Sequence, residues 1–291
     1  MTNTQIEGVI AAVPTPFLED GSPDITAFLS HCKWALANGA DGLNVLGTTG
    51  EANSQNVSAR KQMMKAAAEA LDPGVLMVGT GAPDFETTLE LTRYADELGY
   101  PVALILPPYY YKPVPDSALL KWFEALDTAL GDAPIEIYLY NFPALTGIPY
   151  SVDMIGKLPK RVTGIKDSSA DLPYCREIVR QNPDFKVFPS SETALGTARA
   201  DGFAGCISAS VNVTAPLAAK LWRDEAKDAE LLKTVTSLRT TMASVPLIAA
   251  VKYLISRREK DPNWETLRLP LEPLTAQEKE ILGDSIKTLG Y

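Results

Sequence analysis

The feature that most constrains the fold is a regular alternation of short apolar runs with longer amphipathic segments along the 291 residues. The apolar runs are rich in β-branched residues and almost continuously hydrophobic, which is typical of parallel strands covered on both faces. The stretches between them carry apolar residues at helical spacing. The eight runs occupy residues 8–13, 42–46, 75–79, 102–106, 136–140, 162–165, 185–188 and 205–208.

Eight consecutive strand–helix units predict an α/β fold, a (β/α)8 TIM barrel. A doubly wound sheet would also alternate, but the number of units and the chain length favour a closed barrel, and no glycine-rich dinucleotide fingerprint follows the first run. We expect the catalytic barrel to occupy residues 1–228. Two further helical stretches, at about 230–256 and 275–289, predict a C-terminal helical extension over residues 229–291 that packs on the barrel.

Charge and composition limit which binding partners and which cellular compartment can be expected. There are 27 basic and 36 acidic residues, a net charge of −9, without a basic tract, so neither nucleic acid nor an anionic membrane is an expected partner. No apolar stretch is long enough to predict a membrane span. Residues 1–5 lack the basic and apolar pattern of a secretory signal, and the three cysteines form no CxxC pair, so a cytoplasmic location is expected.

A single histidine, His31, limits the available chemistry. Most zinc sites and Ser–His catalytic arrangements need one or more histidines at the reacting centre, so no metal is expected. His31 falls in a helical stretch far from any strand end. We interpret it as a structural or surface residue.

Reactive groups in such barrels come from the carboxyl ends of the strands and the loops that follow. Lys166 directly follows the sixth apolar run, where burial would remove water from the ammonium and favour the neutral amine. A neutral amine condenses with a ketone or aldehyde to give a Schiff base. The alternative, that Lys166 points outward, is less favoured because both faces of these strands are covered.

Hydroxyl groups at neighbouring strand ends supply candidate proton carriers. Tyr140 ends the fifth run, and Thr48 and Tyr110 could complete a relay with it, although tyrosines at a barrel mouth also serve as packing residues. Thr48, Thr49 and Gly50 offer hydroxyls and backbone N–H groups that suit a carboxylate, but a plain turn explains them about as well.

Further polar residues follow strands seven and eight. Ser190, Glu192 and Ser208 carry groups that can hydrogen-bond the hydroxyls of a substrate. We therefore include them among the candidate substrate-binding residues.

Three segments together resemble the dihydrodipicolinate synthase / N-acetylneuraminate lyase family: Gly47-Thr48-Thr49-Gly50-Glu51, Tyr140-Asn141-Phe142-Pro143 and Gly164-Ile165-Lys166-Asp167. The resemblance extends over nearly the whole chain. It implies a class I pyruvate aldolase, usually a homotetramer, that uses a lysine Schiff base and no metal or other cofactor. Lys166 would form the Schiff base with pyruvate or a 2-keto acid, Tyr140 would be the general acid/base, and Thr48 the relay hydroxyl.

The same resemblance assigns three more positions. Tyr110 resembles the tyrosine that family members contribute across a dimer interface, so a homo-oligomer, dimer or tetramer, is expected. Thr49, with its backbone N–H, would hold the carboxylate of pyruvate. The carbonyl of Ile207 matches a conformationally special position near the site.

Leu145 bears on the substrate. Dihydrodipicolinate synthases carry an arginine at this place that grips the carboxylate of aspartate semialdehyde, a contact that leucine cannot make. Residues 140–147 resemble more closely the 2-keto-3-deoxygluconate aldolases, although residues 190–193 differ from those enzymes.

The predicted function is aldol cleavage of a 2-keto-3-deoxy sugar acid or a related hydroxylated 2-keto acid, releasing or condensing pyruvate. The alternatives are a 4-hydroxy-tetrahydrodipicolinate synthase, a keto-deoxy sugar acid dehydratase, and a non-catalytic regulatory barrel that binds 2-keto acids.

Overall fold

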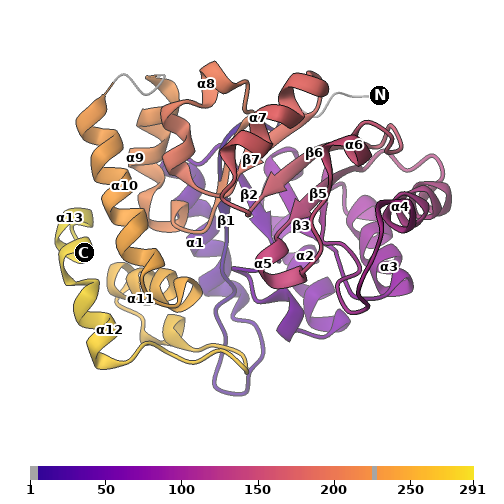
Figure 1. Cartoon of the computed structure of the whole chain (residues 1–291). Helices are drawn as coiled ribbons and strands as arrows, with labels where there is room; N and C mark the ends of the chain where they lie inside the picture. The colour runs from indigo at the N-terminus through magenta and orange to yellow at the C-terminus, as the bar shows by residue number, and fades with distance from the viewer. Residues whose placement is uncertain (1–5, 225–227) are drawn as a thin grey trace.

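The computed structural model, which describes residues 6–224 and 228–291, is a parallel barrel surrounded by helices (Figure 1). The predicted (β/α)8 fold is confirmed. The stretch 1–5, on which the expectation about a secretory signal rests, lies outside the described residues. The eight strands found there are β1 (Gly8–Ala12), β2 (Gly42–Val45), β3 (Leu76–Gly79), β4 (Val102–Ile105), β5 (Glu136–Asn141), β6 (Val162–Asp167), β7 (Lys186–Pro189) and β8 (Gly205–Ser208).

The strands form one sheet in the order β7-β6-β5-β4-β3-β2-β1-β8, and every paired neighbour is parallel. The two outermost strands approach each other, and the N–H of Ala204 donates to the carbonyl of Val187 at 2.9 Å. The sheet is therefore a nearly closed ring. All eight carboxyl ends gather at one mouth, which is the end where the candidate residues were expected.

Two strand ends differ from the expected limits in ways that matter for the site. β6 continues to Asp167, so Lys166 lies inside the strand, paired in register with Tyr140 on one side and Phe188 on the other. β2 stops at Val45 because Leu46 adopts a φ of 56°, which no extended strand accommodates.

Helices cover the outside of the ring. Those of the barrel are α1 (Ile25–Ala37), α2 (Val57–Ala70), α3 (Phe85–Glu97), α4 (Asp116–Leu130), α5 (Pro143–Thr146), α6 (Val152–Ile155), α7 (Leu172–Gln181), α8 (Ala198–Asp201) and α9 (Val211–Arg223), with 3₁₀ turns η1 (Ala52–Ser54), η2 (Pro73–Val75) and η3 (Glu192–Gly196). Alternate strand residues face outward against these helices, such as Val9 and Ala11, or inward into the barrel, such as Ile10. Tyr140 belongs to the inward-facing group.

The C-terminal extension is more broken than its periodicity predicts. The stretch 230–256 divides into α10 (Ala229–Ala243) and α11 (Leu247–Glu259), with Pro246 as the N-cap of α11, and the stretch 275–289 divides into α12 (Ala276–Ile281) and α13 (Gly283–Leu289). The 3₁₀ turn η4 (Pro262–Glu265) follows α11. A second apolar core, which includes Met242, Leu254 and Trp264, joins these helices to α9.

Figure 1 shows α10, α12 and α13 along one flank of the barrel, while α11 and the segment after it lie towards the end where the strands terminate. Within the described residues, no single helix is long and apolar enough to cross a membrane. α10 and α11 reach that length and hydropathy only as a pair, and the chain bends by 114° between them.

His31 is fully buried, which excludes a surface role. Its Nε2 lies 2.8 Å from the Asn212 side-chain oxygen and its Nδ1 lies 2.8 Å from the Arg258 guanidinium. Because Asn212 offers an acceptor and Arg258 a donor, the ring is the neutral tautomer with its proton on Nε2. Burial, followed by the positive charge of Arg258, lowers the pKa of His31 to about 3.

Candidate active site

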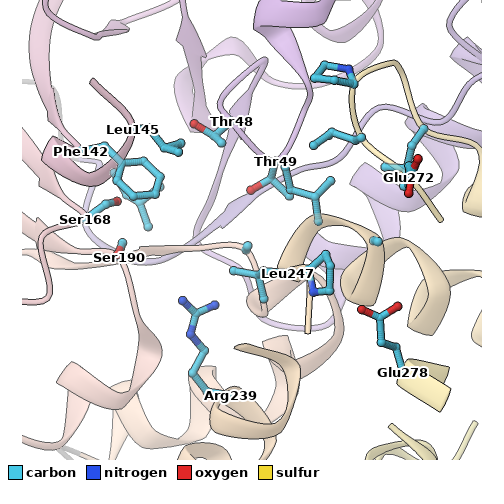
Figure 2. A pocket seen from close by; sticks show the side chains of 18 of the residues that line it. Thr48, Thr49, Phe142, Leu145, Ser168, Ser190, Arg239, Leu247, Glu272 and Glu278 are labelled. Carbon is cyan, nitrogen blue, oxygen red and sulfur yellow. The ribbon is translucent and has the colours of Figure 1, made fainter. Parts of the chain in front are cut away.

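A cavity of about 720 Å³ opens at the carboxyl ends of the strands and extends under the C-terminal segment (Figure 2). Residues of β5, β6 and β8 and of the loops after β2, β5, β6, β7 and β8 form one part of its wall. α10, α11 and the segment 267–278 form the rest. The predicted site residues that line this cavity are Thr48, Thr49, Tyr140, Leu145, Lys166, Ser190 and Ile207.

Lys166, Tyr140 and Thr48 form a compact cluster in the wall of this cavity. The Nζ atom of Lys166 lies 4.4 Å from the centroid of the Tyr140 ring, and only 3% of the lysine is exposed. The Tyr140 hydroxyl lies 3.1 Å from the Thr48 hydroxyl. An amine that reaches the cavity from a buried strand thus stands beside a phenol already linked to a second hydroxyl, which suits proton transfer next to an imine.

The loop after β2, in which Thr48 and Thr49 line the cavity, contains unpaired backbone donors. Within the described residues, the N–H groups of Thr48, Thr49 and Gly50 have no acceptor in the protein, whereas the N–H of Glu51 donates to the carbonyl of Thr48. Leu46 and Glu51, which bracket these residues, both have positive φ angles, 56° and 55°. Successive free N–H groups in such a turn favour an anion such as a carboxylate.

A buried ion pair fixes this loop to the C-terminal helices. Glu51 accepts a hydrogen bond from Lys252 of α11 at 2.7 Å, and both side chains are fully buried. The Lys252 ammonium also donates to the carbonyls of Thr15 and Thr266, and the second Glu51 oxygen accepts the Arg268 N–H at 2.7 Å. Burial lowers the pKa of Lys252, while Glu51 opposes that shift. The pair therefore ties the loop after β2 to the segment that closes the cavity.

A buried carboxylate, that of Asp167, directly follows Lys166 in β6. Asp167 accepts a hydrogen bond from the Asn141 side chain at 2.6 Å and from the Ser169 hydroxyl at 2.8 Å. Burial raises the pKa of Asp167, and these hydrogen bonds act in the opposite direction. The Asn141–Asp167 bond joins the two strands one residue beyond Tyr140 and Lys166, so it fixes the spacing of these two residues.

Four predicted positions do not line the cavity. Glu192 and Ser208 are fully buried and bond each other, with the Ser208 hydroxyl 2.6 Å from a Glu192 oxygen, so neither side chain borders the cavity where the substrate contact was predicted. Gly50 lies behind the wall, with its carbonyl bonded to Thr15. Tyr110 is 73% exposed on the loop after β4 and lies outside the cavity.

The sequence reasoning missed much of the outer wall. Phe142 and Ser168 each stand two residues beyond a chosen position, and strand-end position could have found them. Arg239, Leu247, Glu272 and Glu278 come from the C-terminal extension, which no barrel rule places at the mouth (Figure 2). Across the described part of the chain, no three His, Cys, Asp or Glu side chains are grouped so that they could hold a metal ion.

Comparisons with known proteins agree on one group of relatives. A family model described as the dihydrodipicolinate synthetase family matches residues 5–289. A 4-hydroxy-tetrahydrodipicolinate synthase of Methylobacterium radiotolerans is 32% identical, over 100% of this chain and 98% of that protein.

Two solved structures have the same fold. The dihydrodipicolinate synthase of Agrobacterium tumefaciens aligns with a TM-score of 0.89 at 27% identity, over 98% of this chain and 99% of that one. YagE, a prophage protein of E. coli K12 from the dihydrodipicolinic acid synthase family solved in complex with pyruvate, aligns with a TM-score of 0.87 at 26% identity, over 98% of each chain.

Proposed function

Because this chain belongs to the dihydrodipicolinate synthetase family, we propose that it cleaves a 2-keto-3-deoxy sugar acid, or a related hydroxylated 2-keto acid, to pyruvate and an aldehyde. The reaction class follows from the family: the chain is a class I, pyruvate-dependent carbon–carbon lyase. The observation that supports the assignment of its chemistry is the buried Lys166 amine beside the Tyr140–Thr48 hydroxyl pair.

The proposed reaction begins when the Lys166 amine attacks the C2 ketone, loses water and forms a protonated imine. The imine accepts the electron pair of the C3–C4 bond as that bond breaks, which leaves the enamine of pyruvate on Lys166. Tyr140, whose own proton leaves with that water, takes the proton from the C4 hydroxyl as it becomes the aldehyde, with Thr48 as its hydrogen-bond partner. Tyr140 then returns this proton to C3 of the enamine, and hydrolysis of the imine releases pyruvate and restores the phenol.

The anion-binding loop supports the placement of the keto acid. A carboxylate held by the free N–H groups of Thr48 and Thr49 would direct the adjacent C2 carbon towards Lys166. The carbonyl of Ile207 borders the same cavity. No metal is part of the proposed reaction, because the imine supplies the electron sink.

The choice between a hydroxylated keto acid and aspartate semialdehyde as substrate rests on Leu145. It lines the cavity and is 64% exposed, so an apolar side chain stands at the mouth where an arginine would meet aspartate semialdehyde. Hydroxyls of Thr49, Ser168 and Ser190 also border the cavity and suit a hydroxylated substrate. The second candidate is a 4-hydroxy-tetrahydrodipicolinate synthase, which the names of several relatives favour.

Two assays test the proposal. Release of pyruvate from 2-keto-3-deoxygluconate is compared with turnover of pyruvate plus aspartate semialdehyde, and we expect the first to be the more efficient. Efficient condensation with the semialdehyde would instead support the second candidate. Trapping with borohydride in the presence of pyruvate should place the adduct on Lys166. Absence of this adduct would reject the Schiff-base mechanism for both candidate functions.

The proposed role of Tyr110 requires a second copy of the chain. It is exposed and packs edge-on against Tyr111, with 5.1 Å between the ring centroids. We propose that a homo-oligomer brings the Tyr110 hydroxyl of a neighbouring copy to the relay. A variant that is monomeric in sedimentation experiments should then lose turnover while pyruvate trapping persists.

A further inference from the structure

The cavity contains a cationic side chain that the proposed reaction does not use. Arg239 projects from α10, and Figure 2 shows its guanidinium directed into the cavity. The cations among the described lining residues are Lys166, which is committed to the Schiff base, and Arg239. Any second anionic group on a substrate would therefore find its partner in Arg239.

A buried network orients this guanidinium. Arg239 Nη1 donates to the Ser210 hydroxyl at 3.3 Å, and that hydroxyl donates in turn to a Glu192 oxygen at 2.8 Å. Because the Ser210 proton points to Glu192, a lone pair remains for Arg239. The other Glu192 oxygen accepts from Thr214 of α9 at 2.9 Å, so the carboxylate that fixes Ser210 is itself fixed. Glu192 thus acts on the cavity through Ser210 and not by direct contact.

Most of the hydrogen-bonding capacity of Arg239 remains available. A guanidinium has five N–H donors, and Ser210 takes one. Within the described residues, no carboxylate forms an ion pair with Arg239. Its position near the end of β8 is also where (β/α)8 barrels frequently bind the anionic groups of ligands, beside the loops after strands seven and eight.

We propose that Arg239 binds an anionic group, a carboxylate or a phosphate, at the end of the substrate remote from the keto carbon. The aldehyde that is released or condensed then carries this negative charge. Arg239 is a specificity residue for the aldehyde half, whereas Lys166 and the Thr48–Thr49 loop serve the pyruvate half. This inference rests on the proposed function and makes its substrate class narrower.

The test uses condensation of pyruvate with three aldehydes that differ only at C3. Glyceraldehyde is neutral, tartronate semialdehyde carries a carboxylate, and glyceraldehyde 3-phosphate carries a phosphate. The unaltered chain is compared with Arg239→Gln and Arg239→Lys. Lys233→Gln is the matched control, because it removes one positive charge from an exposed position on the same helix, outside this cavity.

We expect the unaltered chain to favour at least one anionic aldehyde over glyceraldehyde. Arg239→Gln should lower kcat/KM for that aldehyde by about 10-fold to 100-fold, as for the loss of a charge-assisted hydrogen-bonded pair. Arg239→Lys should recover part of the loss, and Lys233→Gln should have no effect. Borohydride trapping of pyruvate should persist in the Arg239 variants, and their turnover of glyceraldehyde should fall less than their turnover of that anionic aldehyde.

Three results would overturn the inference: no preference for either anionic aldehyde, no turnover of either, or an equal loss for all three aldehydes in Arg239→Gln. Loss of pyruvate trapping in that variant would also overturn it, since Arg239 would then serve the pyruvate half. Failure of the proposed function is recognised separately, because the unaltered chain would then show no adduct on Lys166.

Discussion

Replacement of Lys252 by methionine tests whether the Glu51–Lys252 ion pair stabilises the loop after β2. Methionine preserves most of the volume but removes the ammonium and its three hydrogen bonds, to Glu51, to the Thr15 carbonyl and to the Thr266 carbonyl. The Glu51 carboxylate would remain fully buried, with the Arg268 N–H as its remaining partner. An uncompensated charge in this position is costly because water cannot reach it.

The expected loss of stability is large. Breaking a buried pair by removing one partner costs about 3–5 kcal/mol. Lys287→Met is the control: Lys287 pairs with Asp284 at 3.1 Å on the surface, where both side chains are more than 80% exposed, and its loss should cost less than about 1 kcal/mol.

Equilibrium unfolding in urea measures the stability of both variants. The loss of unfolding free energy in the double variant Glu51→Gln/Lys252→Met should be about 2 kcal/mol smaller than the sum of the losses in the two single variants. The reason is that the double variant leaves no unpaired charge behind. A cost below about 1 kcal/mol for Lys252→Met, or strict additivity in the double variant, would refute the argument that the pair fixes the loop.

The remaining predictions concern titration and proton transfer. The pKa of His31 is lowered to about 3 in the folded protein, below its unfolded value of about 6.5, so the stability it contributes is present above pH 6.5 and is lost at about 1.4 kcal/mol per pH unit as the pH falls towards 3. As the chain has one histidine, NMR of its imidazole measures this directly, and an ordinary pKa would refute it. Tyr140→Phe should lower turnover at least 100-fold while pyruvate trapping on Lys166 persists in part, and rapid-quench assays that find unchanged turnover would remove Tyr140 from the mechanism. Thr48→Val keeps the shape but removes the hydroxyl bonded to Tyr140, so it should lower kcat by about 10-fold or more, whereas unchanged kcat would exclude Thr48 from the relay.

Local patterning was sufficient to predict the barrel and the end of it at which the candidate residues gather. The periodicities of strands and helices can be recognised within short stretches of sequence. Parallel strands bring their carboxyl ends to one mouth of the barrel, so Lys166 and Tyr140 could be expected to lie together. The structure places them in register on β5 and β6. The family resemblance of these segments is likewise confirmed by the match over residues 5–289.

Positions that depend on contacts between distant segments could not be predicted in the same way. Glu192 stands at a strand end with a polar side chain, but the Thr214 hydroxyl on α9 helps to turn it away from the cavity. Arg239 follows Lys166 by 73 residues, and its place in the cavity depends on how α10 packs and on the break before Pro246. Amphipathic periodicity indicates that a helix exists, not which part of the barrel it covers.

The identity of the lysine that forms the Schiff base is the most direct test of the proposed chemistry. The chain is treated with pyruvate and borohydride, digested, and its modified peptide is identified by mass spectrometry, with Lys166→Arg as the control because arginine retains the charge but is not nucleophilic. We predict a single reduced pyruvate adduct on Lys166 and none in Lys166→Arg. An adduct on another lysine, no adduct in the unaltered chain, or one that persists in Lys166→Arg would contradict the mechanism.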